Sequence, residues 1–397
     1  MPSITRRGFL TAAAGVTGTM LVAACTTTKN NQENKTVIAY VGSRTTVERQ
    51  ARGKGISTYS IDAQTGQWTQ VQQIETVNPA YLTLDRSQRF LYAVHGDGTT
   101  VSAYTIDPAN GSLTPLNEQD TGGKNPAHIV ADPANRFVIV SNHSSGSVVT
   151  LPIQPDGSLG PVTGKYELPG TPGPHRIDQT GSKPHQVVFD PQNQFMIVPD
   201  KGLDRIFVLR LDTANGQLVQ VSSVATREAT GPRHVAFHRK LPYLYCIDEL
   251  RSTVTTYHWD QNQGQLQPIQ ILSSSAPTFT TDTRGGEIVV GADGNYVYAT
   301  NRSGAGDSTP GGPDPDTIGI FRVDPETGLL TAISWQPTQG IRPRFACLGP
   351  DKTMIYAANE RSDSIIEFHA DGDKLTPTGQ TVATGSPTCI AFRTTNS

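Results

Sequence analysis

The stretch that decides the fold is GPRHVAF at residues 231–237, followed by YLYCIDE at residues 243–249. Two short runs rich in apolar and β-branched side chains, joined by a tight polar turn, predict a β-hairpin. The same pattern recurs along the chain with Pro or Gly at its head. The apolar start of the second strand falls twelve residues after that head, as from Pro232 to Leu244. The other copies begin at Pro79, Pro126, Pro184, Gly285 and Pro343. This constant register is typical of a repeat protein.

Each copy continues into a second hairpin whose turn contains glycine, which supplies the positive φ that such turns need. The seven turn glycines are Gly66, Gly111, Gly157, Gly216, Gly264, Gly328 and Gly372. Each repeat therefore contains four antiparallel strands, and the turns recur every 44 to 64 residues. This spacing is typical of β-propeller blades. We predict an all-β protein, a seven-bladed β-propeller of four-stranded antiparallel blades.

The chain begins and ends within a blade. Residues 36–41, TVIAYV, match the second strand of a repeat, and residues 387–392, PTCIAF, match the first. One blade would combine a C-terminal inner strand with three N-terminal strands, which closes the ring and leaves no open sheet edge. We predict a single domain over residues 36–397, because a closed ring of repeats uses all of this part of the chain.

A segment typical of export signals precedes the repeats. Arg6 and Arg7 are followed by a short run rich in Ala, Gly and Thr, residues 8–24. The arginine pair predicts a twin-arginine signal peptide over residues 1–24, and the run is too short and too weakly apolar for a lasting transmembrane helix. The sequence VAAC before and at Cys25 resembles a lipoprotein cleavage box, so we expect lipidation of Cys25 and a polar tether over residues 25–35. We expect the mature protein in the periplasm or on the outer face of the cell membrane, attached only through its lipid.

Composition limits the partners and cofactors. The formal net charge is −3, and no basic bias suggests a nucleic-acid partner. After Cys25 the chain has Cys246, Cys347 and Cys389, without the spacing of a disulfide framework or a metal site. We expect these three to be small buried side chains. We predict no metal and no other cofactor, a small-molecule partner, and a monomer.

The long loops of the predicted propeller all belong to the class of connections that reaches one face of the disc. Such loops on a rigid scaffold usually carry binding and catalysis. They cover residues 44–55, 164–183, 273–284 and 302–317. The last contains Asp307, Asp314 and Asp316 and could hold calcium, but its spacing matches no known calcium loop, so we prefer a solvated flap.

Two positions of the repeat bring charged side chains to that face. The residue after the head is Ala, Gly or Thr in several blades, so the fold does not require charge there. His185 and Arg233 at this position are candidates for chemistry, and Arg344 occupies the same place. Glu249 follows the second strand, close to Arg233 by hairpin geometry, and Arg284 enters the next blade. The residues equivalent to Glu249 are Gly96, His143, Lys201, Arg302 and Glu360.

This set has a chemical interpretation. Two guanidinium groups suit an anionic substrate or a developing oxyanion, and a carboxylate or an imidazole can take a proton from water. The alternative is an Arg233–Glu249 ion pair that only joins two strands. The arginines of this face also predict a positive funnel for an anionic substrate, unless each pairs with an acid. They are Arg44, Arg233, Arg284, Arg302 and Arg344.

Several sequence motifs of this chain resemble those of the seven-bladed propeller lactonase family, which includes bacterial 6-phosphogluconolactonases and the fungal carboxy-cis,cis-muconate cyclase. The resemblance spans residues 37–392. It rests on KPHQV (183–187), GPRHV (231–235), DEL (248–250), RGGEI (284–288) and RPRF (342–345). It implies hydrolysis of a sugar-acid or related anionic lactone, with a functional cluster at His185, Arg233, Glu249 and Arg284.

Within that cluster we assign Glu249 as the base and His185 as proton donor or relay. Arg233, Arg284 and Arg344 are assigned to the substrate anion or the oxyanion. For Glu249 to act as a base, its burial must offset the effect of Arg233 on its pKa. In two respects the chain departs from the family: Asp248 stands where Asn is frequent, and the export signal favours a lactone other than a cytoplasmic sugar phosphate. A lactone-forming cycloisomerase and a non-catalytic extracytoplasmic binding propeller are the alternatives.

Overall fold

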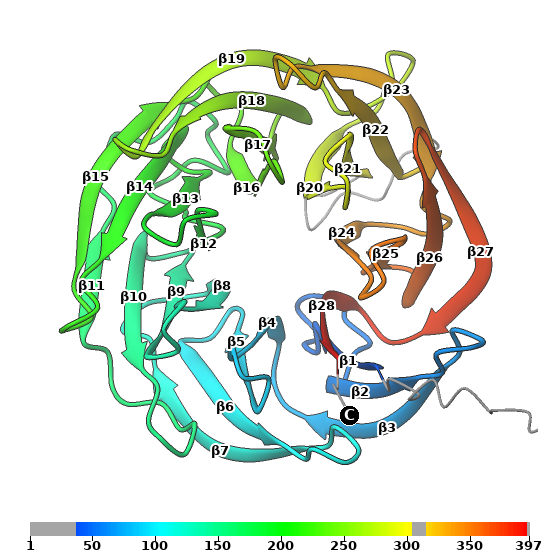
Figure 1. Cartoon of the computed structure of the whole chain (residues 1–397). Helices are drawn as coiled ribbons and strands as arrows, with labels where there is room; N and C mark the ends of the chain where they lie inside the picture. The colour runs from blue at the N-terminus through cyan, green and yellow to red at the C-terminus, as the bar shows by residue number, and fades with distance from the viewer. Residues whose placement is uncertain (1–36, 304–314, 395–397) are drawn as a thin grey trace, which may run out of the picture. The chain divides into compact units, whose positions relative to one another are not determined.

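The computed structural model describes residues 37–303 and 315–394. These residues form seven sheets of four antiparallel strands, arranged as blades around a central axis (Figure 1). The described ranges contain strands and turns but no helix, and hence no helix able to cross a membrane. The predicted seven-bladed propeller is confirmed.

Each blade runs from an inner strand beside the axis to an outer strand at the rim (Figure 1). From inner to outer, the strands of the seven blades are β28 (Pro387–Thr394), β1 (Val37–Ser43), β2 (Gly55–Ile61) and β3 (Trp68–Glu75); β4 (Pro79–Leu84), β5 (Phe90–His95), β6 (Thr100–Ile106) and β7 (Leu113–Asp120); β8 (Pro126–Ala131), β9 (Phe137–Asn142), β10 (Ser147–Pro152) and β11 (Gly164–Glu167); β12 (Val188–Phe189), β13 (Met196–Asp200), β14 (Arg205–Leu211) and β15 (Leu218–Ala225); β16 (Pro232–Phe237), β17 (Tyr243–Asp248), β18 (Thr253–Asp260) and β19 (Gln265–Ser273); β20 (Thr283–Val290), β21 (Tyr296–Ser303), β22 (Thr317–Val323) and β23 (Leu330–Pro337); β24 (Pro343–Leu348), β25 (Met354–Asn359), β26 (Ser364–Asp371) and β27 (Lys374–Ala383).

The ring closes as the sequence predicts. β28 pairs with β1 in antiparallel register, with Val37 opposite Thr394, and Figure 1 shows this red strand inside the blue ones. The Thr388 hydroxyl donates to the carbonyl oxygen of Gly42 at 3.2 Å. The last strand also reaches the next blade, because Arg393 Nε donates to the carbonyl oxygen of Gln88 at 3.1 Å.

A β-bulge follows the head residue of most inner strands. In β16, Pro232 pairs with Asp248 and His234 with Ile247, which leaves Arg233 unpaired. β4, β8 and β24 shift register at the equivalent place, and β20 shifts just after Gly285. A bulge bends its strand and redirects a side chain. The position that carries the candidate residues is therefore a structural irregularity built into the repeat.

The turn glycines join neighbouring blades. All seven have positive φ, as expected. At Gly157, where φ is 86°, a Cβ atom would lie 2.2 Å from the ring of Phe90 in the preceding blade. The Tyr92 hydroxyl of that blade donates to the Gly157 carbonyl oxygen at 3.1 Å. The same tyrosine-to-glycine bond recurs for Tyr40 and Gly111, Tyr245 and Gly328, and Tyr298 and Gly372.

Several predicted features lie outside the described residues: the signal peptide, the tether with Cys25, and Asp307 and Asp314 of the long loop. The Asp316 carboxylate accepts hydrogen bonds from the backbone N–H groups of Ser303 and Arg342. The carboxylate therefore joins the two described ends of that loop, Ser303 and Asp316, and also links them to the segment before β24.

The three cysteines of the propeller are free thiols. Cys246 and Cys389 are buried, as expected, and Cys347 is partly buried.

Candidate active site

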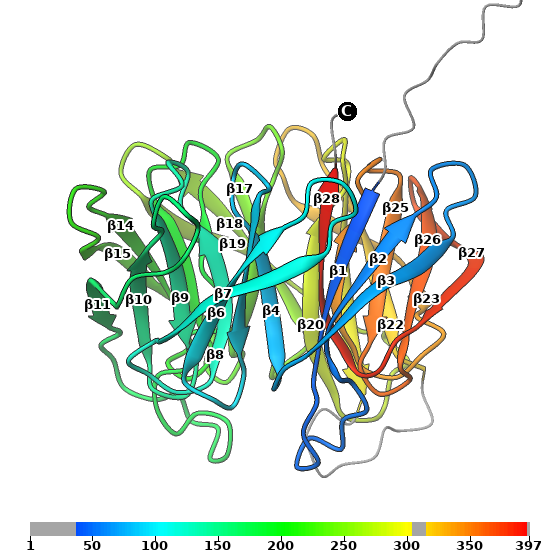
Figure 2. The same cartoon turned by 90° about the horizontal axis from the view of Figure 1, so that it is seen from below.

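A polar cavity of about 220 Å³ opens at one mouth of the central axis. The loop between β1 and β2, which projects from that face in Figure 2, contributes Arg44 and Arg49. The loop before β12 contributes Asp178 and Lys183. The remaining lining residues are Asn125, Ala127, His143, His185, Lys201, Glu249, Arg302, Arg342, Arg344 and Glu360. The long-loop face therefore carries the cavity.

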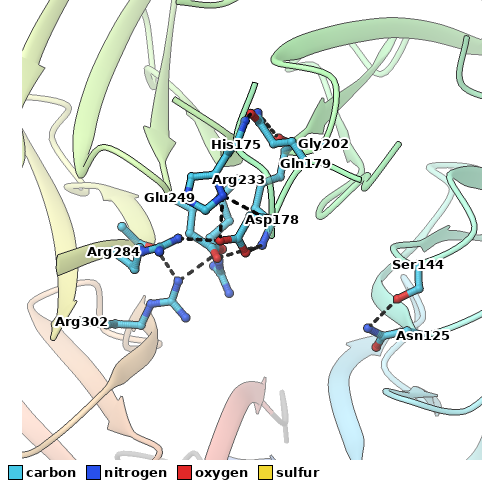
Figure 3. Close-up of polar contacts among 12 residues, drawn as sticks. Asn125, Ser144, His175, Asp178, Gln179, Gly202, Arg233, Glu249, Arg284 and Arg302 are labelled. Atoms are coloured by element: carbon cyan, nitrogen blue, oxygen red, sulfur yellow. Dashed lines mark hydrogen bonds and ion pairs between the residues drawn. The ribbon is translucent and has the colours of Figure 1, made fainter. Parts of the chain in front are cut away.

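Glu249 is held by three cations from three blades. Its Oε1 lies 3.0 Å from Lys201 Nζ, and its Oε2 lies 3.1 Å from Arg233 Nε and 3.3 Å from Arg302 Nη2. Its side chain is 12% exposed. Figure 3 shows Glu249 between Arg233 and Arg302, in a network that continues through Asp178. Every carboxylate oxygen of Glu249 thus has a charged partner.

The pKa of Glu249 is lowered well below its ordinary range. Burial raises this pKa, but the charges of Lys201, Arg302 and Arg233 together outweigh burial. The expectation that burial would offset Arg233 is therefore wrong, because the fold brings three cations to Glu249 where the hairpin alone supplies one. A carboxylate with so low a pKa keeps its negative charge and is a weak proton acceptor.

Two of the three arginines assigned to the substrate, Arg233 and Arg284, occupy different places from those expected. Arg233 is 1% exposed and does not line the cavity; besides Glu249 it donates from Nη1 to the carbonyl oxygen of Gly286 at 2.5 Å. Arg284 also lies outside the lining, with Nη1 3.1 Å from Asp178 Oδ2. Arg302 instead both contacts Glu249 and lines the cavity. Arg233 and Arg284 therefore contact two residues that line the cavity, Glu249 and Asp178, without lining it themselves.

Asp178 and Lys201 connect the two sides of the network. Asp178 Oδ1 lies 3.3 Å from Lys201 Nζ, so an unbroken path of charges runs from Arg284 to Glu249. The loop that carries Asp178 is fixed in place: Gln179 Nε2 donates to the Lys201 carbonyl oxygen at 2.9 Å, and its Oε1 accepts from the His175 backbone at 2.9 Å. Because Asp178 comes from a long loop outside the repeated strands, the repeat pattern did not predict its position in the site.

His185 faces the cavity as a neutral imidazole. Burial first, and then the charge of Arg233, hold its pKa well below the ordinary histidine value. Its Nδ1 lies 3.0 Å from His234 Nε2, and its Nε2 makes no hydrogen bond with any described residue. His143 packs edge-on against it, with ring centroids 5.2 Å apart. One ring nitrogen of His185 is therefore available to a molecule in the cavity.

Arg344 lines the cavity as predicted, and no described residue lies within ion-pair distance of its guanidinium. Its charge nevertheless affects the groups around it. Burial raises the pKa of Glu360, and Arg344 is the first of the cations that lower it overall. The lining contains seven Lys or Arg side chains against three carboxylates, on a chain of net charge −3. The mouth of the axis is therefore strongly cationic.

The repeat itself contained a signal for the residues that the prediction passed over. His143, Lys201, Arg302 and Glu360 are the equivalents of Glu249 in other blades, and all four line the cavity. Each stands one residue past a second strand or at its end, where the bulged hairpins meet the axis. Together with Glu249, this one repeat position supplies five of the fourteen residues that line the cavity.

The arrangement can hold an anion, stabilise a developing oxyanion, and move a proton through a neutral imidazole. Fixed cations in a cavity with little water act more strongly than they would in bulk solvent. Among the described residues there is no group of three or more His, Cys, Asp or Glu side chains placed to hold a metal ion.

Comparisons with known proteins agree with this chemistry. The model of a family described as "Lactonase, 7-bladed beta-propeller" matches residues 38–392. A 6-phosphogluconolactonase from Bacillus subtilis is 30% identical over 362 residues, 89% of this chain and 98% of that protein. The solved structure of a periplasmic gluconolactonase from Pseudomonas aeruginosa aligns with 90% of this chain and 99% of its own, at 28% identity and a TM-score of 0.79. A solved chain from Bacteroides fragilis aligns with 91% of this chain and 99% of its own, at 27% identity and a TM-score of 0.81.

Proposed function

Because this chain belongs to the lactonase family of seven-bladed β-propellers, we propose that it hydrolyses a sugar-acid lactone in the cavity lined by His185 and Glu249. One observation carries the proposal: a neutral imidazole with a free nitrogen shares a cavity with cations held in fixed positions. Lactone hydrolysis needs both features, since water must lose a proton while the carbonyl oxygen gains negative charge.

The residues divide this work as follows. His185 Nε2 accepts a proton from the attacking water and returns it to the ring oxygen that leaves. Lys201 and Arg302 stabilise the oxyanion of the tetrahedral intermediate. Glu249 holds these two cations in place, and Arg233 supports Glu249 from the buried side. Glu249 thus serves the reaction as a fixed negative charge that touches the oxyanion donors.

We assign the substrate an anionic group that binds Arg344, because this guanidinium has no ion pair among the described residues. Arg344→Gln should raise KM for an anionic lactone about 10- to 100-fold, since a hydrogen bond to a charged group contributes about 1.5–3 kcal/mol. It should leave KM for a neutral sugar lactone nearly unchanged. It should also weaken the dependence of kcat/KM on ionic strength. Steady-state kinetics on both substrates at low and high salt measure these effects.

The matched control is Arg322→Gln, because Arg322 is an exposed arginine of β22 on the surface of a blade. Its variant should match the parent on both lactones. Equal losses on the anionic and the neutral lactone after Arg344→Gln would contradict the assignment of an anionic substrate.

The proposed activity is tested by incubating the mature protein with a panel of phosphorylated, carboxylated and neutral lactones. Hydrolysis of a panel member faster than its spontaneous ring opening supports the proposal. Formation of a lactone from an open-chain unsaturated acid, without hydrolysis, would indicate a cycloisomerase. Binding of a lactone without turnover would indicate a binding propeller.

We also propose that the chain is exported by the twin-arginine route and anchored through a lipid on Cys25. The gluconolactonase from Pseudomonas aeruginosa is described as periplasmic, and its similarity supports the proposal that this chain is exported. Replacing Arg6 and Arg7 together by Lys should leave the precursor in the cytoplasm, because that route depends on the arginine pair. Cell fractionation with an antibody against the propeller measures the distribution.

Cys25→Ala should release the exported protein from the membrane, since a lipid is its only proposed attachment. Cys246→Ala provides a control that changes a buried propeller thiol and leaves the anchor intact. Cys25→Ala protein that stays with membranes after a high-salt wash would show that the anchor is not this lipid.

A further inference from the structure

Three buried groups form a hydrogen-bonded path away from the cavity. His185 Nδ1 lies 3.0 Å from His234 Nε2, and His234 Nδ1 lies 2.7 Å from Glu287 Oε1. Each residue is 5% exposed or less, and the three come from three consecutive blades. His185 lines the active-site cavity, whereas Glu287 lines a separate cavity of about 390 Å³ with Tyr81, Phe345 and Cys347. The path therefore connects two cavities through the centre of the ring.

The hydrogen bonds link the protonation state of Glu287 to the tautomer of His185. When Glu287 is ionised it only accepts, so His234 Nδ1 must carry a hydrogen. Neutral His234 then has a lone pair on Nε2, and His185 must donate to it from Nδ1. The remaining nitrogen of His185, Nε2, is left with a lone pair toward the cavity. In this state His185 is a proton acceptor for a bound water.

The opposite state follows when Glu287 is protonated. Glu287 donates to His234 Nδ1, so the hydrogen of neutral His234 lies on Nε2 and points at His185 Nδ1. The hydrogen of His185 must then lie on its Nε2, facing the cavity. A single proton on Glu287 thus changes His185 from an acceptor into a donor at the same atom. Lactone hydrolysis uses these two states in succession.

Burial and the surrounding positive charges keep both histidines neutral, so Glu287 is the group of this path that titrates. Burial and then Arg233 hold the pKa of His234 well below its ordinary value, with further lowering from Arg344 and Arg302 and opposition from Glu249. For His185 the contributions after burial come from Arg233, His234, His143 and Arg344. His128, whose ring centroid lies 5.9 Å from that of His234, has a lowered pKa for the same reason of burial.

Glu287 is the buried carboxyl group at the far end of this path. Burial raises its pKa to about 7, although Arg233, Arg302 and Arg344 lower it and Ile288 N donates to Oε1 at 3.2 Å. The other titratable groups that face it are Tyr81, Cys347 and Cys389, whose raised pKa values keep them neutral. Its Oε2 is buried and has no hydrogen-bond partner. This environment suits a carboxyl group that gains and loses a proton near neutral pH.

We propose that His234 and Glu287 form a proton relay that switches His185 between base and acid in the proposed lactone hydrolysis, on which this inference rests. As the water oxygen bonds to the lactone carbonyl carbon, the water gives one proton to His185 Nε2. His185 passes its Nδ1 proton to His234 Nε2, and His234 passes its Nδ1 proton to Glu287 Oε1. The negative charge that Glu287 loses appears on the tetrahedral intermediate, so the total charge is unchanged.

Collapse of the intermediate runs the relay backwards. The ring C–O bond breaks, and His185 Nε2 gives its proton to the departing alkoxide. His185 Nδ1 then takes a proton from His234 Nε2, and His234 Nδ1 takes one from Glu287 Oε1. The relay ends in its starting state, and the product is a hydroxy acid that releases its carboxyl proton to solvent. Glu287 and His234 are positioning residues in this scheme, because His185 alone touches the reacting water.

The test is the pH dependence of Glu287→Gln, an isosteric change that cannot take up a proton. In the parent, kcat/KM should rise between about pH 6 and pH 8, because the starting state needs ionised Glu287. The variant should lose that rise and lose about 10²-fold in kcat at the upper end, the usual contribution of general acid–base catalysis. His234→Gln, which breaks the relay at its middle, should behave in the same way.

The control is Glu367→Gln, since Glu367 is also a buried carboxylate that accepts from two hydroxyl groups, those of Tyr356 and Thr378, on another blade. It should keep the parental profile. If Glu287→Gln retains both the rise and the rate of the parent, the relay is wrong. If the parent itself hydrolyses no lactone, the proposed function fails, and the next measurement still decides the relay.

That measurement is the nitrogen-15 spectrum of the histidine rings, with His185 and His234 assigned by comparison with their Gln variants among the nine histidines. In the parent, the Nδ1 and Nε2 signals of His185 should exchange character as Glu287 titrates. In folded Glu287→Gln they should stay in one tautomer throughout. A His185 tautomer that is unchanged with pH in the parent would overturn the relay, whatever the enzyme's activity.

Discussion

A chain that ends at Ser386 is expected to lose the folded state of the whole propeller. The truncation removes β28, which supplies the inner strand of its blade and pairs with β1 along its full length. Cys389 and Ile390 leave a hydrophobic cluster that also contains Leu82 of the next blade and Ala358 of the preceding one. Both neighbours therefore lose packing, and β1 is left with an unpaired edge.

The loss should be cooperative, because a closed ring has no free end from which a single blade can unfold separately. Circular dichroism on heating should show no native-like transition, and size-exclusion chromatography should show an expanded or aggregated chain. A chain that ends at Thr394 is the matched control and should melt like the full protein, since it keeps all of β28. Native-like melting of the shorter chain would show that the ring does not depend on its closure.

Glu249→Gln should reduce kcat by roughly 10²–10³, the usual cost of losing an oxyanion donor, because Lys201 and Arg302 lose the charge that positions them. It should also lower the free energy of unfolding by about 3–5 kcal/mol, the usual cost of breaking a buried ion pair from one side. Arg233 would then be a buried cation without a carboxylate partner. KM for an anionic lactone should fall or stay constant, since the cavity gains positive charge.

The pH dependence of stability separates this electrostatic role from a simple packing role. Because the pKa of Glu249 is lowered in the folded state, its stabilising contribution is complete above the ordinary glutamate pKa of about 4.3. It is lost only as the pH falls from there through the lower folded-state pKa. The melting temperatures of parent and variant should therefore differ at neutral pH and converge in acid.

Glu360→Gln is a matched comparison, because Glu360 occupies the same repeat position and lines the same cavity but has no described ion-pair partner within 4.0 Å. It should cost less than a tenth as much activity as Glu249→Gln. An early-melting Glu249→Gln protein that hydrolyses lactone at the parental rate would reduce Glu249 to a link between strands.

The fold was predictable from the sequence because its information is local and repeated. The head Pro or Gly, the twelve-residue spacing and the turn glycines each specify a hairpin, and the matching fragments at the two termini specify the closure. None of these inferences needed a distance between residues remote in sequence. The bulge after the head was not predicted, although the pattern of residues such as Ala80, Arg233 and Arg344 had already marked that position.

The site was predictable only in part, because its properties depend on sums over several blades. The contact between Arg233 and Glu249 follows from one hairpin and was predicted. The pKa of Glu249 depends on Lys201 and Arg302 from two other blades, and the balance between their charges and burial cannot be judged from spacing. Arg284 was expected at the substrate because it enters the next blade, yet Asp178 from a distant loop holds it aside.

The relay residues stand one position further along the same inner strands. The residues two places after the head include His128, His234, Glu287 and Cys389, an unusual set for the buried centre of a protein. Their types were visible in the sequence, but their hydrogen bonds run between blades, and only the ring brings His234 within reach of both His185 and Glu287.

The most direct test of the central claim is ring opening of a sugar-acid δ-lactone by the protein in oxygen-18 water, followed by mass spectrometry. Water attack at the carbonyl carbon predicts enzyme-dependent formation of the hydroxy acid with one heavy oxygen, located in its carboxylate. His185→Gln should reduce this rate toward the spontaneous one. A parental protein that opens no lactone of the panel faster than the spontaneous reaction would contradict the account.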